Sequence, residues 1–125
     1  MKKLAIIAIA FLALSCKKES QESFGKPEAT TEKSPEALGK EIFEGKGNCV
    51  ACHQVDQKIV GPSIKEIAKI YKDKNGDMVT FMKGEGEPIV DPSQYEVMKA
   101  NFGITKEMSD EELKALEAYM FSTLK

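Results

Sequence analysis

The chain has 125 residues, which is enough for one small domain and additional terminal segments. Hydrophobic residues make up 42% of it and charged residues 30%, an ordinary balance for a globular protein. The formal net charge is −2, all 18 basic residues are lysines, and no basic run indicates a protein that binds nucleic acid.

The first 15 residues have the organisation of an export signal. Lys2 and Lys3 form a charged start, and an uninterrupted apolar run follows from Leu4 to Leu14. This run is too short to span a bilayer as a transmembrane helix. We therefore interpret residues 1–15 as a signal peptide that directs the protein to the periplasmic side of a bacterial cell envelope.

A cysteine stands where this apolar run gives way to polar sequence. The residues Leu14-Ser15-Cys16 resemble a bacterial lipobox, in which a signal peptidase cuts before a lipidated cysteine, although Ala13 occupies the place of the usual leucine. The alternative is an ordinary cleaved signal in which Cys16 has no role. Because a spare thiol is a liability in oxidising surroundings, we predict that Cys16 is lipidated and anchors the protein to a membrane.

Residues 16–34 are rich in Lys, Glu, Ser, Thr, Gln and Pro, and Phe24 is the only large apolar residue among them. Such a stretch cannot bury enough apolar surface to offset the loss of chain entropy. We expect it to be a disordered tether, with the folded domain covering residues 35–125.

The first helix of this domain is predicted to begin at Ser34-Pro35-Glu36. This triplet combines a capping hydroxyl, a proline at the first helical position and an acidic residue in the first turn. Ile42 and Phe43 then share an apolar face, and the glycines at 45 and 47 end the helix.

The five residues Cys49-Val50-Ala51-Cys52-His53 are the most informative part of the sequence. Two thiols at this spacing can bond two neighbouring vinyl groups of a haem as thioethers, and the histidine that follows then lies under the ring, where it can ligate the iron. His53 is the only histidine in the chain. The motif predicts one covalently bound haem c, attached through Cys49 and Cys52, with His53 as an axial ligand.

The motif has three other interpretations. A thioredoxin-like dithiol has the same spacing but sits at a strand-to-helix junction, and the sequence has no run of β-branched residues to supply such strands. A zinc site needs about four ligands, whereas only Cys49, Cys52 and His53 lie close together. A Cys49–Cys52 disulfide is possible in an oxidising compartment but gives His53 no role.

Further helices are predicted after the motif. Ile64, Ile67, Ala68 and Tyr71 have helical spacing, and the helix stops within residues 72–77 at an Asn-Gly turn signal. Asp77 is placed to cap a short helix with four apolar residues at positions 78, 79, 81 and 82. Residues 84–92, which contain two glycines and two prolines, are predicted to be a loop.

The last helix has the clearest start of all, because Ser109 and Glu112 form a capping box. Leu113, Leu116 and Met120 continue as an apolar stripe along it. Together the patterns predict an all-α domain of four or five short helices without a convincing strand. A domain this small gains from a covalently bound haem as the largest apolar group of its core.

From Gly39 to the C-terminus the chain resembles the class I cytochrome c family. The matching features occur in the family's order: Gly39-x-x-Ile42-Phe43, the Cys-x-x-Cys-His motif, Val60-Gly61-Pro62, a methionine-bearing loop, and Leu116-x-x-Tyr119. The resemblance implies a small helical fold around one haem, in which the first and last helices cross at Gly39 and Phe43 packs near Tyr119. It also implies that the carbonyl of Pro62 accepts a hydrogen bond from the ring of His53. The alternative for Gly61-Pro62 is a plain turn.

The resemblance further implies that a methionine in the chain leading into the last helix is the second axial ligand. Met98 is the expected ligand, because it precedes the cap Ser109 by enough residues to cross the haem face and return. Met108 is the alternative, and Lys99 stands where many relatives have proline. Met78, Met82 and Met120 are expected to pack in the core.

These features predict a one-electron carrier rather than an enzyme, because two axial ligands let iron change oxidation state without binding a substrate. The expected partners are a quinol-oxidising complex and a terminal oxidase or reductase, with no role for nucleic acid. The alternative is a small haem enzyme or gas sensor with an open sixth position. A third possibility is a haem-free lipoprotein with a Cys49–Cys52 disulfide.

Overall fold

The computed structural model describes residues 33–125, and it contains six α-helices and two short 3₁₀ turns in that range. The predicted signal peptide, Cys16 and the predicted tether up to residue 32 lie outside the described residues. The α-helices are α1 (Pro35–Glu44), α2 (Ile64–Lys74), α3 (Met78–Met82), α4 (Tyr95–Lys99), α5 (Phe102–Thr105) and α6 (Asp110–Ser122), and the 3₁₀ turns are η1 (Cys49–Ala51) and η2 (Pro92–Gln94).

The prediction of an all-α domain is confirmed. Residues 33–125 form no strand, only an isolated bridge between His53 and Lys58. In the same range no helix combines the length and the apolar character needed to cross a bilayer. The six helices exceed the expected four or five, because α4 and α5 have only five and four residues and no side-chain cap that would mark their starts in the sequence.

The predicted helix starts have a clear local origin in their caps. Ser34 and Ser63 each accept a hydrogen bond from the backbone three residues on, at 3.2 Å, and Asp77 does the same from Thr80 at 2.8 Å. Ser109 and Glu112 form the expected capping box at the start of α6. These caps satisfy backbone N–H groups that have no partner within the helix.

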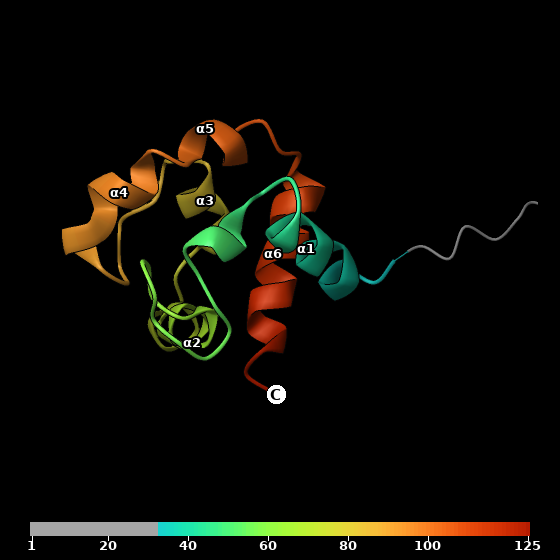
Figure 1. The fold of residues 1–125 in the computed structure, drawn as a ribbon, viewed down its shortest axis with the longest axis horizontal. Coiled ribbons are helices and arrows are strands. Elements are labelled where there is room, and N and C mark those ends of the chain that lie inside the picture. The colour runs from blue at the N-terminus through green and yellow to red at the C-terminus, as the bar shows by residue number, and fades with distance from the viewer. Residues whose placement is uncertain (1–32) are drawn as a thin grey trace, which may run out of the picture. The chain divides into compact units, whose positions relative to one another are not determined.

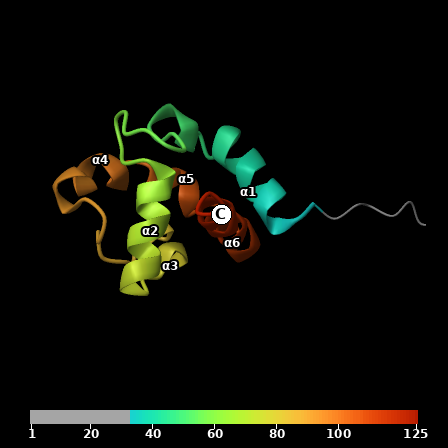
Figure 2. The same ribbon diagram turned by 90° about the horizontal axis from the view of Figure 1, so that it is seen from below.

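The helices α1 and α6 lie against each other in both views of the fold (Figures 1 and 2). Their closest approach is at Gly39, where a β-carbon would lie only 1.9 Å from the carbonyl oxygen of Ala115. The rings of Phe43 and Tyr119 pack beside this crossing with centroids 5.4 Å apart. Only glycine allows the two backbones to approach this closely.

The core extends from this crossing to one face of α2 and α3. Ile64 and Ala68 on α2 and Leu113 and Leu116 on α6 are all fully buried. Their spacing matches the apolar stripes that the sequence predicts for these two helices. Met78 and Met82, at the ends of α3, are also buried in this core.

Between α3 and α6 the chain crosses the other side of the domain as a loop followed by η2, α4 and α5 (Figure 1). Aromatic side chains hold this stretch in place. The ring of Phe81 on α3 lies 5.4 Å from that of Phe102 and 6.3 Å from that of Tyr95, measured between centroids. The stretch therefore forms a wall opposite α2, and the space between them is the candidate site.

Candidate functional site

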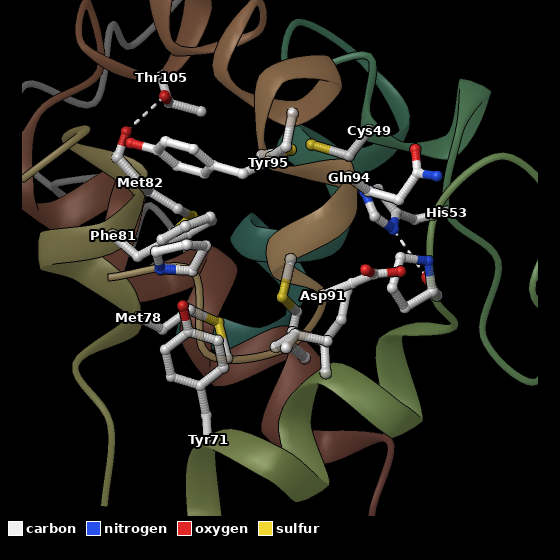
Figure 3. A pocket seen from close by; sticks show the side chains of 16 residues that line it. Cys49, His53, Tyr71, Met78, Phe81, Met82, Asp91, Gln94, Tyr95 and Thr105 are labelled. Atoms are coloured by element: carbon white, nitrogen blue, oxygen red, sulfur yellow. Dashed lines mark hydrogen bonds between the residues drawn. The ribbon is translucent and has the colours of Figure 1, made fainter. Parts of the chain in front are cut away.

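An apolar pocket occupies the space between α2, α3 and the stretch that contains α4 (Figure 3). Nearly all of its lining is apolar, as is usual for pockets that hold organic ligands and cofactors. The residues predicted to bind or orient the haem that line it are Cys49, His53, Pro62 and Met98.

The two cysteines of the motif are held one tight turn apart. The backbone N–H groups of Cys52 and His53 both donate to the carbonyl of Cys49, at 3.1 and 2.9 Å. Cys49 lines the pocket, whereas Cys52 is half-buried beside it and is not part of the lining. The two thiols are not bonded to each other.

The electrostatics of Cys49 argue against a redox-active dithiol. Burial raises the pKa of the Cys49 thiol to about 11. Catalytic cysteines in Cys-x-x-Cys motifs have a lowered pKa, because the thiolate is the reactive form. Cys49 is therefore suited to a covalent, non-titrating role.

The ring of His53 is oriented by the backbone of the Gly61-Pro62 turn. Its Nδ1 lies 2.7 Å from the carbonyl oxygen of Pro62 (dashed line at His53 in Figure 3). Because a carbonyl can only accept, Nδ1 carries the proton, and in the neutral ring the lone pair is then on Nε2. The ring also packs on Gly61, where a β-carbon would lie 2.4 Å from Cε1 of His53. The turn thus presents Nε2 as a potential metal ligand.

Five methionines lie in the described residues, and they divide into two groups. Met78, Met82, Met98 and Met120 line the pocket. Met108 does not; it lies beside a separate surface hollow together with Lys83 and Asp110. Of the two methionines that the sequence leaves as candidate ligands, only Met98 shares the pocket with His53.

The pocket suits a haem on three observations. Its apolar lining matches a large flat hydrophobic ring, and a thiol, an imidazole and a thioether line it together. In addition, the buried hydroxyl of Tyr71 lacks a hydrogen-bond partner among the described residues. Figure 3 shows Tyr71 at the end of the pocket away from Cys49. A buried polar group without a partner is costly, so a partner supplied by a bound group is expected there.

These features define a small helical protein with covalently bound haem, that is, a c-type cytochrome. A family model described as Cytochrome c matches residues 36–124, which is more than half of the chain, so the chain belongs to the Cytochrome c family. It is a mono-haem c-type cytochrome, and the prediction of one covalently bound haem c is confirmed.

Comparison with curated proteins gives short, strong matches. The chain is 52% identical over 40 residues to cytochrome c-552 of Nitrosomonas europaea, covering 32% of this chain and 38% of that protein. It is 49% identical over 35 residues to cytochrome c-551 of Pseudomonas denitrificans, covering 28% and 42% of the two chains. It is 45% identical over 38 residues to cytochrome c-551 of Azotobacter vinelandii, covering 30% and 45%. The matched part spans less than half the length of each relative.

Several lining residues were not identified as site residues from the sequence. Asp91, Gln94 and Thr105 line the pocket from the stretch between α3 and α6. The sequence holds no signal for them, because they have no helical periodicity and belong to no motif. Their positions follow from the course of the chain around the pocket.

Proposed function

We propose that this cytochrome is a one-electron carrier in which His53 and Met98 are the two axial ligands of the haem iron. The observation that carries the proposal is that one apolar pocket contains both side chains, with Nε2 of His53 freed by the Pro62 hydrogen bond. The haem supplies an iron that gains and loses one electron.

The protein side chains then set the conditions for electron transfer. A histidine and a methionine together leave the sixth position filled, and a methionine ligand raises the reduction potential. The Pro62 carbonyl fixes the ring of His53 and increases its basicity. The lining of the pocket is almost entirely apolar and offers few polar groups to hold water beside the haem.

The ligand assignment is tested by two matched substitutions. A thioether ligand gives ferric haem a weak charge-transfer band in the far red. Met98→Ala should remove this band, lower the reduction potential and allow water to reach the iron. Met108→Ala should keep the band, because Met108 lies outside the pocket. A lost band in Met108→Ala with an intact band in Met98→Ala would reverse the assignment.

The alternative function is a haem enzyme or gas sensor, which needs an open sixth position and polar groups near it. The chain has one histidine and no arginine, and no lysine lines the pocket among the described residues. The pocket also contains the thioether of Met98. Exposure of the ferrous protein to carbon monoxide separates the two functions, because rapid and complete binding at neutral pH would favour the enzyme or sensor.

We further propose that the carrier meets its redox partners, a quinol-oxidising complex and a terminal oxidase or reductase, through brief contacts. Val50, Ile59 and Val60 are exposed close to Cys52 in the sequence. Asp56 in the same loop is paired with Lys65, so the charge there is partly neutralised. Small apolar contacts of this kind suit the weak, short-lived complexes of redox proteins.

The proposed location is the periplasmic side of the bacterial envelope, with the protein held at a membrane by a lipid on Cys16. The support is the apolar run that ends at Cys16 and the polar stretch that follows it. Cys16→Ala should release the protein into the soluble fraction with an unchanged visible spectrum. A wild-type protein that is soluble and has an unmodified N-terminus would contradict lipidation.

A further inference from the structure

The stretch that carries Met98, residues 87–104, makes few hydrogen bonds or ion pairs with the rest of the domain. Its backbone hydrogen bonds are local, such as Asn101 N–H to the carbonyl of Met98 at 2.9 Å. Among the described residues, its side-chain-mediated links to other elements are on the surface: Lys74 Nζ to the carbonyl of Ile89 at 2.9 Å and the ion pair of Lys58 with Asp91 at 3.6 Å. Exposed links of this kind contribute little.

Among the described residues, one buried side-chain hydrogen bond anchors the chain, at Thr105, directly after this stretch. The hydroxyl of Thr105 donates to the carbonyl oxygen of Met82 at 2.5 Å, and the two residues are 23 apart in sequence (Figure 3). Thr105 is 4% exposed, and both residues line the pocket. The bond thus joins the two ends of the chain segment that carries Met98 over the pocket.

This hydrogen bond pairs a backbone carbonyl that has no other partner among the described residues. Met82 is the last residue of α3, and carbonyl groups in the last turn of a helix have no partner within the helix. No backbone N–H among the described residues donates to this carbonyl. Without the Thr105 hydroxyl, a buried acceptor would be left unsatisfied.

We propose that Thr105 is a positioning residue for Met98: its hydrogen bond to Met82 closes the Met98 stretch over the pocket and holds the thioether on the iron. The proposal rests on the proposed function, in which Met98 is an axial ligand. When the bond is absent, the stretch moves away from the iron more often, and the iron–methionine bond is broken in a larger fraction of molecules.

Imidazole binding to the ferric protein measures that fraction. Added imidazole can replace Met98 only in molecules whose stretch has opened, so its apparent dissociation constant falls as the open fraction rises. In Thr105→Val, which keeps the shape but lacks the hydroxyl, imidazole should bind about tenfold more tightly, in line with the loss of one buried hydrogen bond. Thr105→Ser, which restores the hydroxyl, should return most of the wild-type affinity.

The chain offers a matched control. Thr123 also donates its hydroxyl to a methionine carbonyl, that of Met120 at 2.7 Å, but the two residues are three apart within α6. Thr123→Val therefore loses the same kind of bond without releasing the Met98 stretch. Its affinity for imidazole should equal that of the wild type.

The outcomes distinguish a failure of the proposed role of Thr105 from a failure of the Met98 ligand assignment. Wild-type imidazole affinity in Thr105→Val, together with a lost far-red band in Met98→Ala, would overturn the role of Thr105 and leave the ligand assignment intact. An unchanged band in Met98→Ala would instead overturn the proposed ligand.

A measurement on the wild type covers the case in which Thr105→Val fails to fold. Saturating imidazole should speed amide hydrogen exchange in residues 95–105 together and leave α1 and α6 protected. Acceleration that stops before Thr105, or that spreads evenly over the domain, would contradict the proposal.

Discussion

The crossing of α1 and α6 at Gly39 gives a sharp prediction about stability. In Gly39→Ala the new methyl carbon would lie 1.9 Å from the carbonyl oxygen of Ala115 and 2.8 Å from Cβ of Tyr119. Close carbon–oxygen contacts in proteins are about 3.3–3.6 Å, so the two helices must move apart by more than an ångström. The obstacle is backbone on the partner helix, which cannot rotate away as a flexible side chain can.

The magnitude follows from two opposing terms. Alanine favours the helical state by about 1 kcal/mol over glycine. Overpacking of a tight contact costs about 1–3 kcal/mol of stability. Here the cost should be at the upper end of this range, because the backbone must shift and the buried rings of Phe43 and Tyr119 lose contact. We expect a net loss of about 2 kcal/mol, which lowers the melting temperature of a domain this size by about 8–16 °C.

Thermal unfolding of the haem-loaded protein, followed by circular dichroism, measures the effect. Gly103→Ala is the matched control, because Gly103 lies within α5 and a β-carbon there meets nothing within 4 Å. This control should leave the melting temperature unchanged or raise it slightly. The reasoning is refuted if Gly39→Ala melts within 2 °C of the wild type, or if both variants are destabilised equally.

Three further predictions concern the pocket and its surroundings. Gly61→Ala places a β-carbon 2.4 Å from Cε1 of His53 and should displace the imidazole ring. Visible spectroscopy would detect the displacement as a loss of the low-spin haem spectrum. An unchanged spectrum would contradict the close packing of His53 on Gly61. Met78→Ala should lower the free energy of unfolding by about 2–5 kcal/mol, since Met78 is buried, yet keep the far-red band; loss of the band would make Met78 the ligand. The pKa of Asp77 in the folded protein is held below its ordinary value of 3.8, mainly by the hydrogen bond from the Thr80 N–H. The cap formed by Asp77 therefore stabilises α3 fully above pH 3.8, and this stabilisation is lost as the pH falls through the lower pKa of the folded state. Asp77→Ala should therefore cost about 1 kcal/mol at pH 7 and progressively less in acid, and urea titrations that show the same cost at pH 7 and pH 2 would contradict this.

The sequence predicts those parts of the fold that have local causes. The caps at Ser34, Ser63, Asp77 and Ser109 place the starts of four helices, and Asn75, with φ of 49°, ends α2 within the turn expected at residues 72–77. The spacing of the cysteine–histidine motif likewise identifies the haem attachment, because that spacing reflects the haem itself. Each of these signals lies within a few neighbouring residues.

The remaining part of the site depends on contacts between distant residues. The short helices α4 and α5 lack side-chain caps, and the packing of Tyr95 and Phe102 on Phe81 accompanies their formation. The bond of Thr105 to Met82 joins residues 23 apart, and no local pattern announces it. The positions of the methionines in the sequence leave Met98 and Met108 as candidates for the second axial ligand. Only the folded structure shows that Met98 lines the pocket and Met108 does not.

A redox titration followed by visible spectroscopy tests the central proposal of a one-electron carrier most directly. The protein should show a single reversible transition with a slope of about 59 mV per tenfold change in the oxidised-to-reduced ratio, the value for one electron. The far-red band of the ferric form should return fully on reoxidation, because the same two ligands stay on the iron in both states. A second transition, a two-electron slope, or a band that fails to return because the iron has exchanged a ligand would contradict the account.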